Sequence, residues 1–174
     1  MRFNNDFFRR YLEYVPAALA LERSIECEVH STKSWESPIL DLGCGDGIFA
    51  EILFAEQVDV GVDPNPEEIK QARKTGSYKE LIECFGDDIP KSANIYNTVF
   101  SNSVLEHIPN LEPVLKEVHR VMKENGRFYI TVPSRRLEKA TMVVRTLRLL
   151  RLKSLSDKYC QFYNRFWRHY NALD

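Results

Sequence analysis

The stretch ILDLGCGDGIFAEIL, residues 39–53, constrains the fold of this chain more than any other segment. A short apolar run stops at Asp41, and a loop with alternating glycines follows it. A helical pattern of apolar residues then starts at the end of this glycine loop. A buried strand that turns through glycines into a helix is typical of the first half of a βαβ unit.

Strand patterns and helix patterns continue to alternate along the chain as far as residue 133. Because strands that alternate with helices form parallel sheets, the sequence predicts an α/β fold with a parallel sheet of about five strands and helices on both faces. The strands are expected at 38–43, 58–63, 80–85, 96–102 and 127–132, and the helices at 7–30 with a break near Pro16, 47–55, 64–73 and 111–122.

Two of the expected connections carry specific signals. Asn65 is a suitable N-cap for the helix that follows it, and Pro66 suits the first helical position. Asn125 and Gly126 both tolerate positive φ, so a turn is expected there before the last strand.

Several polar or glycine-rich segments fall where the expected strands end. The carboxyl ends of parallel strands share one edge of the sheet, and ligands bind beyond that edge. The segments are the glycine loop, Asp63, Asp87 and Ser101. The topology therefore predicts that these four segments form one candidate site.

The glycine loop, Gly43-Cys44-Gly45-Asp46-Gly47, does not have the pattern of a phosphate-binding loop. No Gly-Lys-Ser/Thr follows it, and its spacing only approximates G-x-G-x-x-G. Asp41 and Asp46 make the loop awkward for a phosphate and favourable for a cation. Asp63 lies 20 residues beyond Gly43, where an acid accepts hydrogen bonds from ribose hydroxyls. We therefore expect a ligand with an adenosine-like part and a positive arm.

The motifs DLGCGDG, GVDPNPEE, GDDIP, SNSVLEHIPN and LKEVHRVMKENGRFYITVPS, taken in this order, resemble those of class I S-adenosylmethionine-dependent methyltransferases. The resemblance is strongest to the type 11-like small-molecule group and covers roughly residues 38–134. It implies a Rossmann-like fold, S-adenosylmethionine as the cofactor and methyl transfer as the activity. It does not specify the methyl acceptor. S-adenosylmethionine has the ribose and the positive arm that the loop predicts, and it has no phosphate.

The resemblance also implies roles for individual residues. Asp41 would hold the methionine ammonium, Asp63 the ribose hydroxyls, and Asp87 the adenine amino group, with Asp88 nearby. The remaining cofactor-binding residues would line the methionine and ribose, pack near the adenine, or present a backbone carbonyl to the ammonium: Gly43, Cys44, Gly45, Gly47, Pro64 and Ser101.

Methyl transfer requires little from the protein beyond alignment and exclusion of water, because the sulfonium is already a good leaving group. His107 is the candidate general base for an acceptor that must lose a proton. The alternative is a histidine that orients the loop before Pro109, and this structural role is favoured. The SNSV motif differs from the N/D-P-P-Y type used for amino groups of adenine or glutamine. A small-molecule or lipid-linked acceptor is therefore expected.

Composition indicates a cytoplasmic protein without a metal site. The four cysteines form no C-x-x-C pair, and no segment has the pattern of a signal peptide or of a membrane span. Up to Ser134 the chain has 14 basic and 22 acidic residues, whereas the remaining forty residues have 10 basic and 3 acidic. No nucleic-acid partner is expected, because no binding motif is present and most of the chain is acidic.

This charge asymmetry suggests two segments: a cofactor-binding domain at 1–134 and a basic helical insertion or tail at 135–174. The first segment is expected to carry an N-terminal helical lid, or equally a plain packing face, formed by the aromatic residues Phe7, Phe8, Tyr11 and Tyr14. Relatives continue with two more strands after this point, so the chain is expected to be truncated. An open sheet edge would then favour a homo-oligomer unless the tail covers it. The tail is interpreted as a lid, with a peripheral contact to anionic lipid as the alternative.

Two other functions remain open at this stage. The missing strands favour a cofactor-binding fragment or regulatory protein without catalysis. The generic glycine loop allows a nucleotide-dependent oxidoreductase.

Overall fold

The computed structural model describes residues 1–132, 149–155 and 157–158. The chain divides into two units. The first unit comprises Met1–Asn102 and Glu112–Ile130, and the second comprises Ser103–Leu111 and Thr131–Asp174. The expectations of a basic lid, a membrane contact and missing strands all concern residues 135–174, which lie mostly outside the described part of the chain.

The first unit is built on a five-stranded sheet, which confirms the predicted α/β fold. The strand order is β3-β2-β1-β4-β5, and β1 pairs in parallel with both β2 and β4, as β2 does with β3. In the centre of the sheet, Asp41 lies between Gly61 on β2 and Phe100 on β4. The strands are β1 Ile39–Leu42, β2 Val58–Asp63, β3 Tyr78–Glu83, β4 Tyr96–Asn102 and β5 Met122–Thr131.

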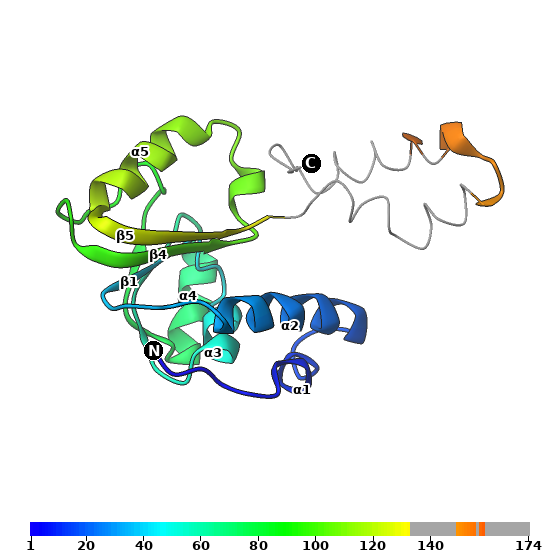
Figure 1. The fold of residues 1–174 in the computed structure, drawn as a ribbon, viewed down its shortest axis with the longest axis horizontal. Coiled ribbons are helices and arrows are strands. Elements are labelled where there is room, and N and C mark those ends of the chain that lie inside the picture. Colours follow the sequence, from blue (N-terminus) through cyan, green and yellow to red (C-terminus); the bar gives the residue numbers. More distant parts are fainter. Residues whose placement is uncertain (133–148, 156, 159–174) are drawn as a thin grey trace. The chain divides into compact units, whose positions relative to one another are not determined.

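Helices cover both faces of the sheet (Figure 1). Helix α5 lies on one face and buries Val114, Val118 and Val121. The helices α2, α3 and α4 lie on the other face, where α2 and α4 each contact α3. Their bounds are α2 Ala17–Ser31, α3 Ile48–Leu53, α4 Pro66–Thr75 and α5 Leu111–Val121.

The N-terminal segment breaks at Pro16, as predicted, and gives the short helix α1, Phe7–Tyr11, before α2. Phe7 and Tyr11 are buried in the core, whereas Phe8 and Tyr14 are exposed. The N-cap prediction for α4 is also confirmed, because the Asn65 side chain accepts a hydrogen bond from the Glu67 N–H at 3.0 Å.

Several sequence-based boundaries are wrong, and β3 begins at Tyr78 rather than at residue 80. Helix α3 is shorter than expected, because the chain is already extended at Phe54. The expected turn at Asn125–Gly126 lies inside β5, and neither residue has positive φ. A Cβ on Gly126 would lie 2.9 Å from the Lys123 carbonyl oxygen. This glycine is therefore required by close backbone approach and not by a left-handed turn.

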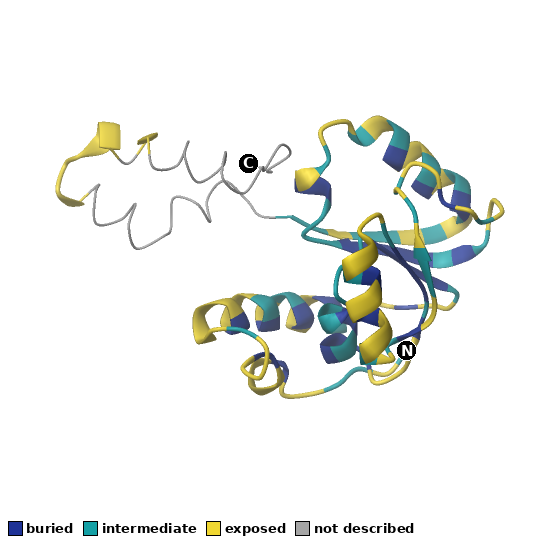
Figure 2. Ribbon diagram, turned by 180° about the vertical axis from the view of Figure 1, so that it is seen from behind, coloured by how far each residue is buried: buried dark blue, intermediate teal, exposed yellow. Residues whose placement is uncertain are grey.

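The central strands carry many of the buried residues, whereas buried and exposed residues alternate along the helices (Figure 2). Trp35 packs the connection between α2 and β1 into the core of the first unit. Its indole N–H donates to the His30 carbonyl at 2.8 Å. Its ring contacts four aromatic rings edge-on or tilted, with centroids 4.9–5.6 Å apart: His30, Phe54, Phe100 and Tyr129. One side chain thereby joins α2 to the end of α3 and to β4 and β5.

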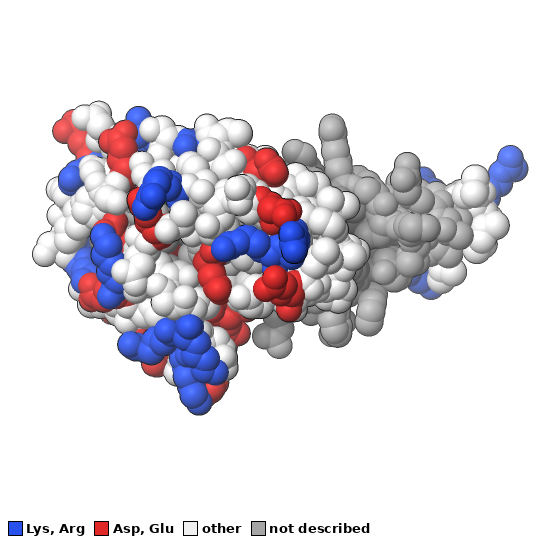
Figure 3. All heavy atoms as spheres, turned by 90° about the horizontal axis from the view of Figure 1, so that it is seen from below, with Lys and Arg blue, Asp and Glu red and all other residues white. Residues whose placement is uncertain are grey.

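On the face shown in Figure 3, lysine and arginine side chains lie among aspartate and glutamate side chains. The exposed ion pairs of the described residues include Arg2–Glu56 at 2.7 Å and Lys70–Glu67 at 3.5 Å. Within the described residues, no helix is both long enough and apolar enough to cross a bilayer.

Replacing Trp35 by alanine should destabilise the first unit by about 3–5 kcal/mol, because it removes a large buried ring and its hydrogen bond. Chemical denaturation measures this change. Trp35→Phe keeps a ring at the same place and should cost clearly less. A loss below about 1 kcal/mol for the alanine variant would show that Trp35 does not organise the core.

Candidate functional site

The glycine loop forms a tight connection from β1 to α3. Gly43, Gly45 and Gly47 all have positive φ, at 79°, 52° and 81°. The N–H groups of Gly43 and Cys44 both donate to the Val62 carbonyl, at 2.8 and 2.9 Å. The loop is therefore fixed to the end of the neighbouring strand β2.

Gly45 and Gly47 have different structural reasons to be glycine. A Cβ on Gly47 would lie 3.0 Å from Ala72 Cα and 3.2 Å from Thr75 Oγ1, so this glycine lets α4 pack closely on the loop. A Cβ on Gly45 would meet only Glu68 Oε2, at 3.9 Å. The backbone at Gly45 therefore faces open space, where a ligand can approach it.

Asp63, at the end of β2, holds this edge together. Its Oδ2 accepts from the Gly45 N–H at 3.0 Å, and its Oδ1 accepts from the Asn65 N–H at 2.9 Å. Its own carbonyl accepts from the Cys84 N–H at 3.2 Å. The predicted proximity of the glycine loop, Asp63 and the end of β3 is therefore present in the structure.

Asp41 is buried at the end of β1, with 3 % of its surface exposed. Its Oδ2 accepts a hydrogen bond from the Tyr78 hydroxyl at 2.6 Å. Burial raises the pKa of Asp41 to about 7, the bond from Tyr78 opposes this rise, and the nearby Asp63 adds to it. Sequence reasoning missed Tyr78, because nothing in the pattern of β3 signals a contact that reaches across β2.

Glu68, in the first turn of α4, is a second acid that sequence reasoning did not assign to the site. Burial raises its pKa, and the charges of Asp46 and Asp63 raise it further. With Asp41, the glycine loop thus has four carboxylates close to it. The sequence carries a signal for Glu68, since an acid one turn into the helix after Asp63 must lie near the strand end, but an acid at this position also fits a role in stabilising the helix dipole.

The segment between β3 and β4 is held against α5. The Ile89 N–H donates to Glu117 Oε1 at 2.8 Å, and Arg120 donates to the carbonyls of Ile89 and Lys91 at 3.0 and 2.8 Å. Arg120 also pairs with Glu117 at 2.6 Å. These contacts fix the segment that carries the exposed residues Asp87 and Asp88.

Phe85 stands out in the same segment, because 69 % of its surface is exposed. It lies two residues before Asp87, beside the expected adenine position. Sequence reasoning did not assign Phe85 to the site, although an aromatic residue directly before the GDD motif is a signal that could have indicated it.

Ser101 is buried in β4, and its hydroxyl donates to the Leu42 carbonyl at 2.9 Å. The next residue, Asn102, donates from Nδ2 to Glu26 Oε2 at 3.0 Å, and Glu26 also pairs with Arg23 at 2.9 Å. Helix α2 is therefore attached to the carboxyl end of β4, and the N-terminal lid stays a prediction.

The remaining predicted residues differ in position. Cys44 is buried, and burial raises the pKa of its thiol, so it is unsuited to act as a nucleophile. Pro64 is exposed after β2. His107 lies on the short 3₁₀ helix Leu105–His107 in the second unit, with Nε2 3.9 Å from Glu106 Oε1. The role of His107 as a base stays a prediction.

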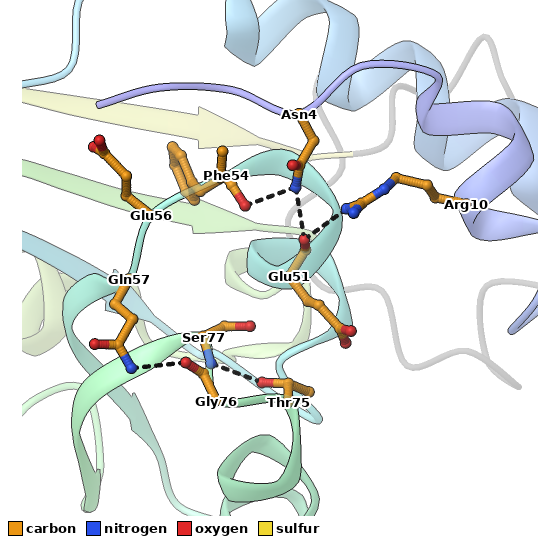
Figure 4. A pocket seen from close by; sticks show the side chains of 10 residues that line it. Asn4, Arg10, Glu51, Phe54, Glu56, Gln57, Thr75, Gly76 and Ser77 are labelled. Atoms are coloured by element: carbon orange, nitrogen blue, oxygen red, sulfur yellow. Dashed lines mark hydrogen bonds between the residues drawn. The ribbon is translucent and has the colours of Figure 1, made fainter.

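A cavity of about 250 Å³ lies near the start of β2 and β3, at the opposite edge of the sheet (Figure 4). Its polar groups are used internally. Asn4 Nδ2 donates to the carbonyls of Glu51 and Phe54, and Gln57 donates to that of Gly76. The hydrogen bonds of Asn4 therefore attach the N-terminal segment to the end of α3, and this cavity is not the candidate site. The described residues contain no group of three potential metal ligands.

Comparison with known proteins identifies the class. The family model described as "Methyltransferase domain" matches residues 5–171, so the chain belongs to this family of methyltransferases. S-adenosylmethionine is the cofactor of this class. The match continues through the basic segment after residue 134.

Individual relatives agree with the family. The chain is 34% identical over 130 residues to the uncharacterized methyltransferase C70.08c of Schizosaccharomyces pombe, covering 70% of this chain and 47% of that protein. It is 30% identical over 102 residues to the mitochondrial ubiquinone biosynthesis O-methyltransferase of Rattus norvegicus, covering 53% and 30%. The chain thus spans about half or less of the length of these curated relatives.

A solved S-adenosylmethionine-dependent methyltransferase from Thermotoga maritima has the same fold. The TM-score is 0.60 at 16% identity, and the match covers 82% of this chain and 67% of the other. The expected Rossmann-like methyltransferase fold is therefore confirmed.

The contact of Glu117 with Ile89 should be measurable in the free protein. Glu117→Ala removes the acceptor of the Ile89 N–H, and we expect hydrogen exchange at this amide to become at least about tenfold faster. Glu112→Ala is the matched control, because Glu112 lies on the same helix and forms an exposed ion pair with Lys116. Unchanged exchange at Ile89 would show that α5 does not hold this segment.

The pKa of Asp41 predicts how stability depends on pH. Because it is raised in the folded state, folding favours protonated Asp41, and this stabilisation is lost as pH rises from about 4 to about 7. Asp41→Asn should therefore raise the free energy of unfolding relative to wild type at pH 8, by roughly 2 kcal/mol more than at pH 5.

Asp59→Asn provides a control of opposite sign for this measurement. Partial burial disfavours the Asp59 charge, but hydrogen bonds from Lys79 and the Ile39 N–H outweigh burial and lower its pKa. Its removal should destabilise the protein at neutral pH, with the loss absent in strong acid. Equal effects of Asp41→Asn at pH 5 and pH 8 would contradict the assignment.

Proposed function

We propose that this domain transfers the methyl group of S-adenosylmethionine to a small-molecule or lipid-linked acceptor. The observation that carries the proposal is the backbone at Gly45, which faces open space and is surrounded by carboxylates. An open glycine admits a ligand to the backbone, and several acids favour a ligand with positive charge over a phosphate.

The residues of this edge fit the cofactor. Asp63 is positioned for the ribose, since its carboxylate oxygens are already oriented by the N–H groups of Gly45 and Asn65. Each oxygen keeps a further lone pair for a hydroxyl. Asp41 and Glu68 supply negative charge for the cationic arm, and Phe85, Asp87 and Asp88 supply contacts for the adenine.

The bound cofactor supplies an activated methyl group on a sulfonium. The protein then has to hold the acceptor in line with that methyl group and exclude water. Helix α2, joined to the end of β4 through Glu26 and Asn102, is the element proposed to cover the acceptor. His107 is proposed to take a proton from acceptors that carry one.

The acceptor class is supported by relatives. The Rattus norvegicus relative is named for methylation of oxygen in ubiquinone biosynthesis, and a Legionella pneumophila relative for O-methylation of malonyl-[acyl-carrier protein]. Both names indicate acceptor oxygens rather than amino groups. Release of S-adenosylhomocysteine with phenolic and carboxylic acceptors measures this activity, with NAD as the control ligand in binding experiments. Binding of NAD in place of S-adenosylmethionine would overturn the proposal.

The two glycines allow a matched test of the loop. Gly45→Val should abolish S-adenosylmethionine binding in calorimetry while the protein stays folded, because the new side chain enters the open space. The positive φ adds a cost of about 1–2 kcal/mol to either valine variant. Gly47→Val should mainly destabilise the fold, because α4 is already in contact there. Normal binding by Gly45→Val would show that the cofactor does not approach this backbone.

Asp63→Ala should weaken S-adenosylmethionine binding about tenfold or more, because hydrogen bonds to a charged group are worth roughly 1.5–3 kcal/mol. Calorimetry on the folded variant checks this. Asp59→Ala, on the same strand at its other end, is the control and should bind normally. Equal affinity of wild type and Asp63→Ala would remove Asp63 from the site.

A further inference from the structure

The hydroxyl of Tyr78 reaches the Asp41 carboxylate across an intervening strand. Tyr78 begins β3, which pairs with β2, and Asp41 lies on β1 on the far side of β2. The two side chains nevertheless meet at 2.6 Å, and both are buried, with 7 % and 3 % of their surfaces exposed. A buried hydrogen bond that skips one strand requires space above that strand.

Gly61 provides this space. It lies on β2 directly opposite Asp41 in the register. A Cβ on Gly61 would lie 2.8 Å from Tyr78 Cδ1 and Cε1 and 2.9 Å from Leu81 Cδ2. The tyrosine ring therefore occupies the position that a side chain at residue 61 would take. Glycine inside a strand weakens it, and such glycines mark places of close approach.

We propose that Tyr78 is a positioning residue of the cofactor site. Its hydroxyl holds the Asp41 carboxylate in place and ionised for the cationic arm of S-adenosylmethionine, and the missing side chain at Gly61 leaves the space that the tyrosine ring occupies. The proposal rests on the proposed function. It adds two residues, neither of them in the glycine loop, to the set that determines cofactor affinity.

The electrostatics explain why a hydroxyl is needed at this position. Burial favours protonated Asp41, and the charge of Asp63 acts in the same direction. A donor that bonds to the carboxylate favours the ionised form and opposes both. A protonated Asp41 has no charge to offer an ammonium group. The Tyr78 hydroxyl thus keeps Asp41 ionised in more of the molecules near neutral pH.

Other titratable groups face this pair from the surrounding elements. They are Asp63 on β2, Cys44 and Asp46 on the glycine loop, and Glu68 on α4. Burial raises the pKa of Cys44 and of Tyr78 far above neutral, so neither titrates there. A test must therefore separate Asp41 from the three other acids, and Asp41→Asn does so.

The test measures S-adenosylmethionine affinity from pH 6 to pH 9 by calorimetry in wild type, Tyr78→Phe, Asp41→Asn and the double variant. We expect wild-type affinity to increase with pH through a midpoint near 7 and to level off by about pH 8. In Tyr78→Phe the midpoint should move up by about one pH unit, which gives about fivefold weaker binding at pH 7 and near recovery at pH 9. Asp41→Asn should bind weakly without this pH step, and adding Tyr78→Phe should change it little.

A purely structural role for Tyr78 gives a different result. Tyr78→Phe would then lose affinity equally at every pH, or would lose it equally in the Asp41→Asn background, and either outcome overturns the proposal. Gly61→Ala displaces the ring while keeping both functional side chains, and it should shift the midpoint in the same direction. Gly76→Ala, at the exposed C-cap of α4, is the glycine control: its φ of 67° makes alanine costly for stability by about 1–2 kcal/mol, but a Cβ there meets no neighbour, so the midpoint should stay unchanged.

A measurement without cofactor keeps this inference separate from the proposed function. The ¹³C resonance of the Asp41 carboxyl, assigned by its loss in Asp41→Asn, should titrate near pH 7 in wild type and higher in Tyr78→Phe. If wild type binds no S-adenosylmethionine but the resonance shifts as expected, the proposed function fails and the Tyr78–Asp41 coupling stands. An unmoved resonance overturns the coupling whatever the binding result.

Discussion

The carboxylate of Asp63 is the interaction on which the carboxyl edge of the sheet depends. One oxygen accepts from Gly45 in the glycine loop and the other from Asn65 ahead of α4. Three connections therefore meet at one residue, because the Cys84 N–H after β3 donates to the backbone carbonyl of Asp63. Asp63 therefore links the conformation of the glycine loop, the start of α4 and the end of β3. A ligand that binds Asp63 would contact the residue to which all three segments are hydrogen-bonded.

The same edge gathers negative charge at an electrostatic cost. Asp41, Asp46, Asp63 and Glu68 lie close enough for burial and mutual repulsion to raise the pKa values of Asp41 and Glu68. A cationic ligand relieves this repulsion, whereas a phosphate increases it. The free protein therefore carries an electrostatic cost at this edge, and in the proposed function the binding of the methyl donor relieves it.

The sequence was sufficient to predict the fold and the positions of Asp63, Asp41 and the glycine loop. The periodicity of apolar residues and the order of strands and helices along the chain determine which strand ends share an edge of the sheet. It failed at Asn125–Gly126, where a turn-forming pair lies inside β5. It also missed contacts that depend on register and side-chain reach, such as Glu117 with Ile89 and Tyr78 with Asp41. Local patterns carry no signal for such contacts, because each partner looks ordinary in its own segment.

Gly61 has a consequence for sequence variation among relatives of this chain. Its space is filled by Tyr78, so a larger residue at 61 is compatible with the fold only if residue 78 becomes smaller, and the reverse change leaves a void. The two positions, 17 residues apart on neighbouring strands, should therefore vary as a pair, and an alignment should contain either glycine with tyrosine or two residues of intermediate size. Such covariation would separate relatives that hold the strand-end acid through a buried hydroxyl from those that hold it in another way.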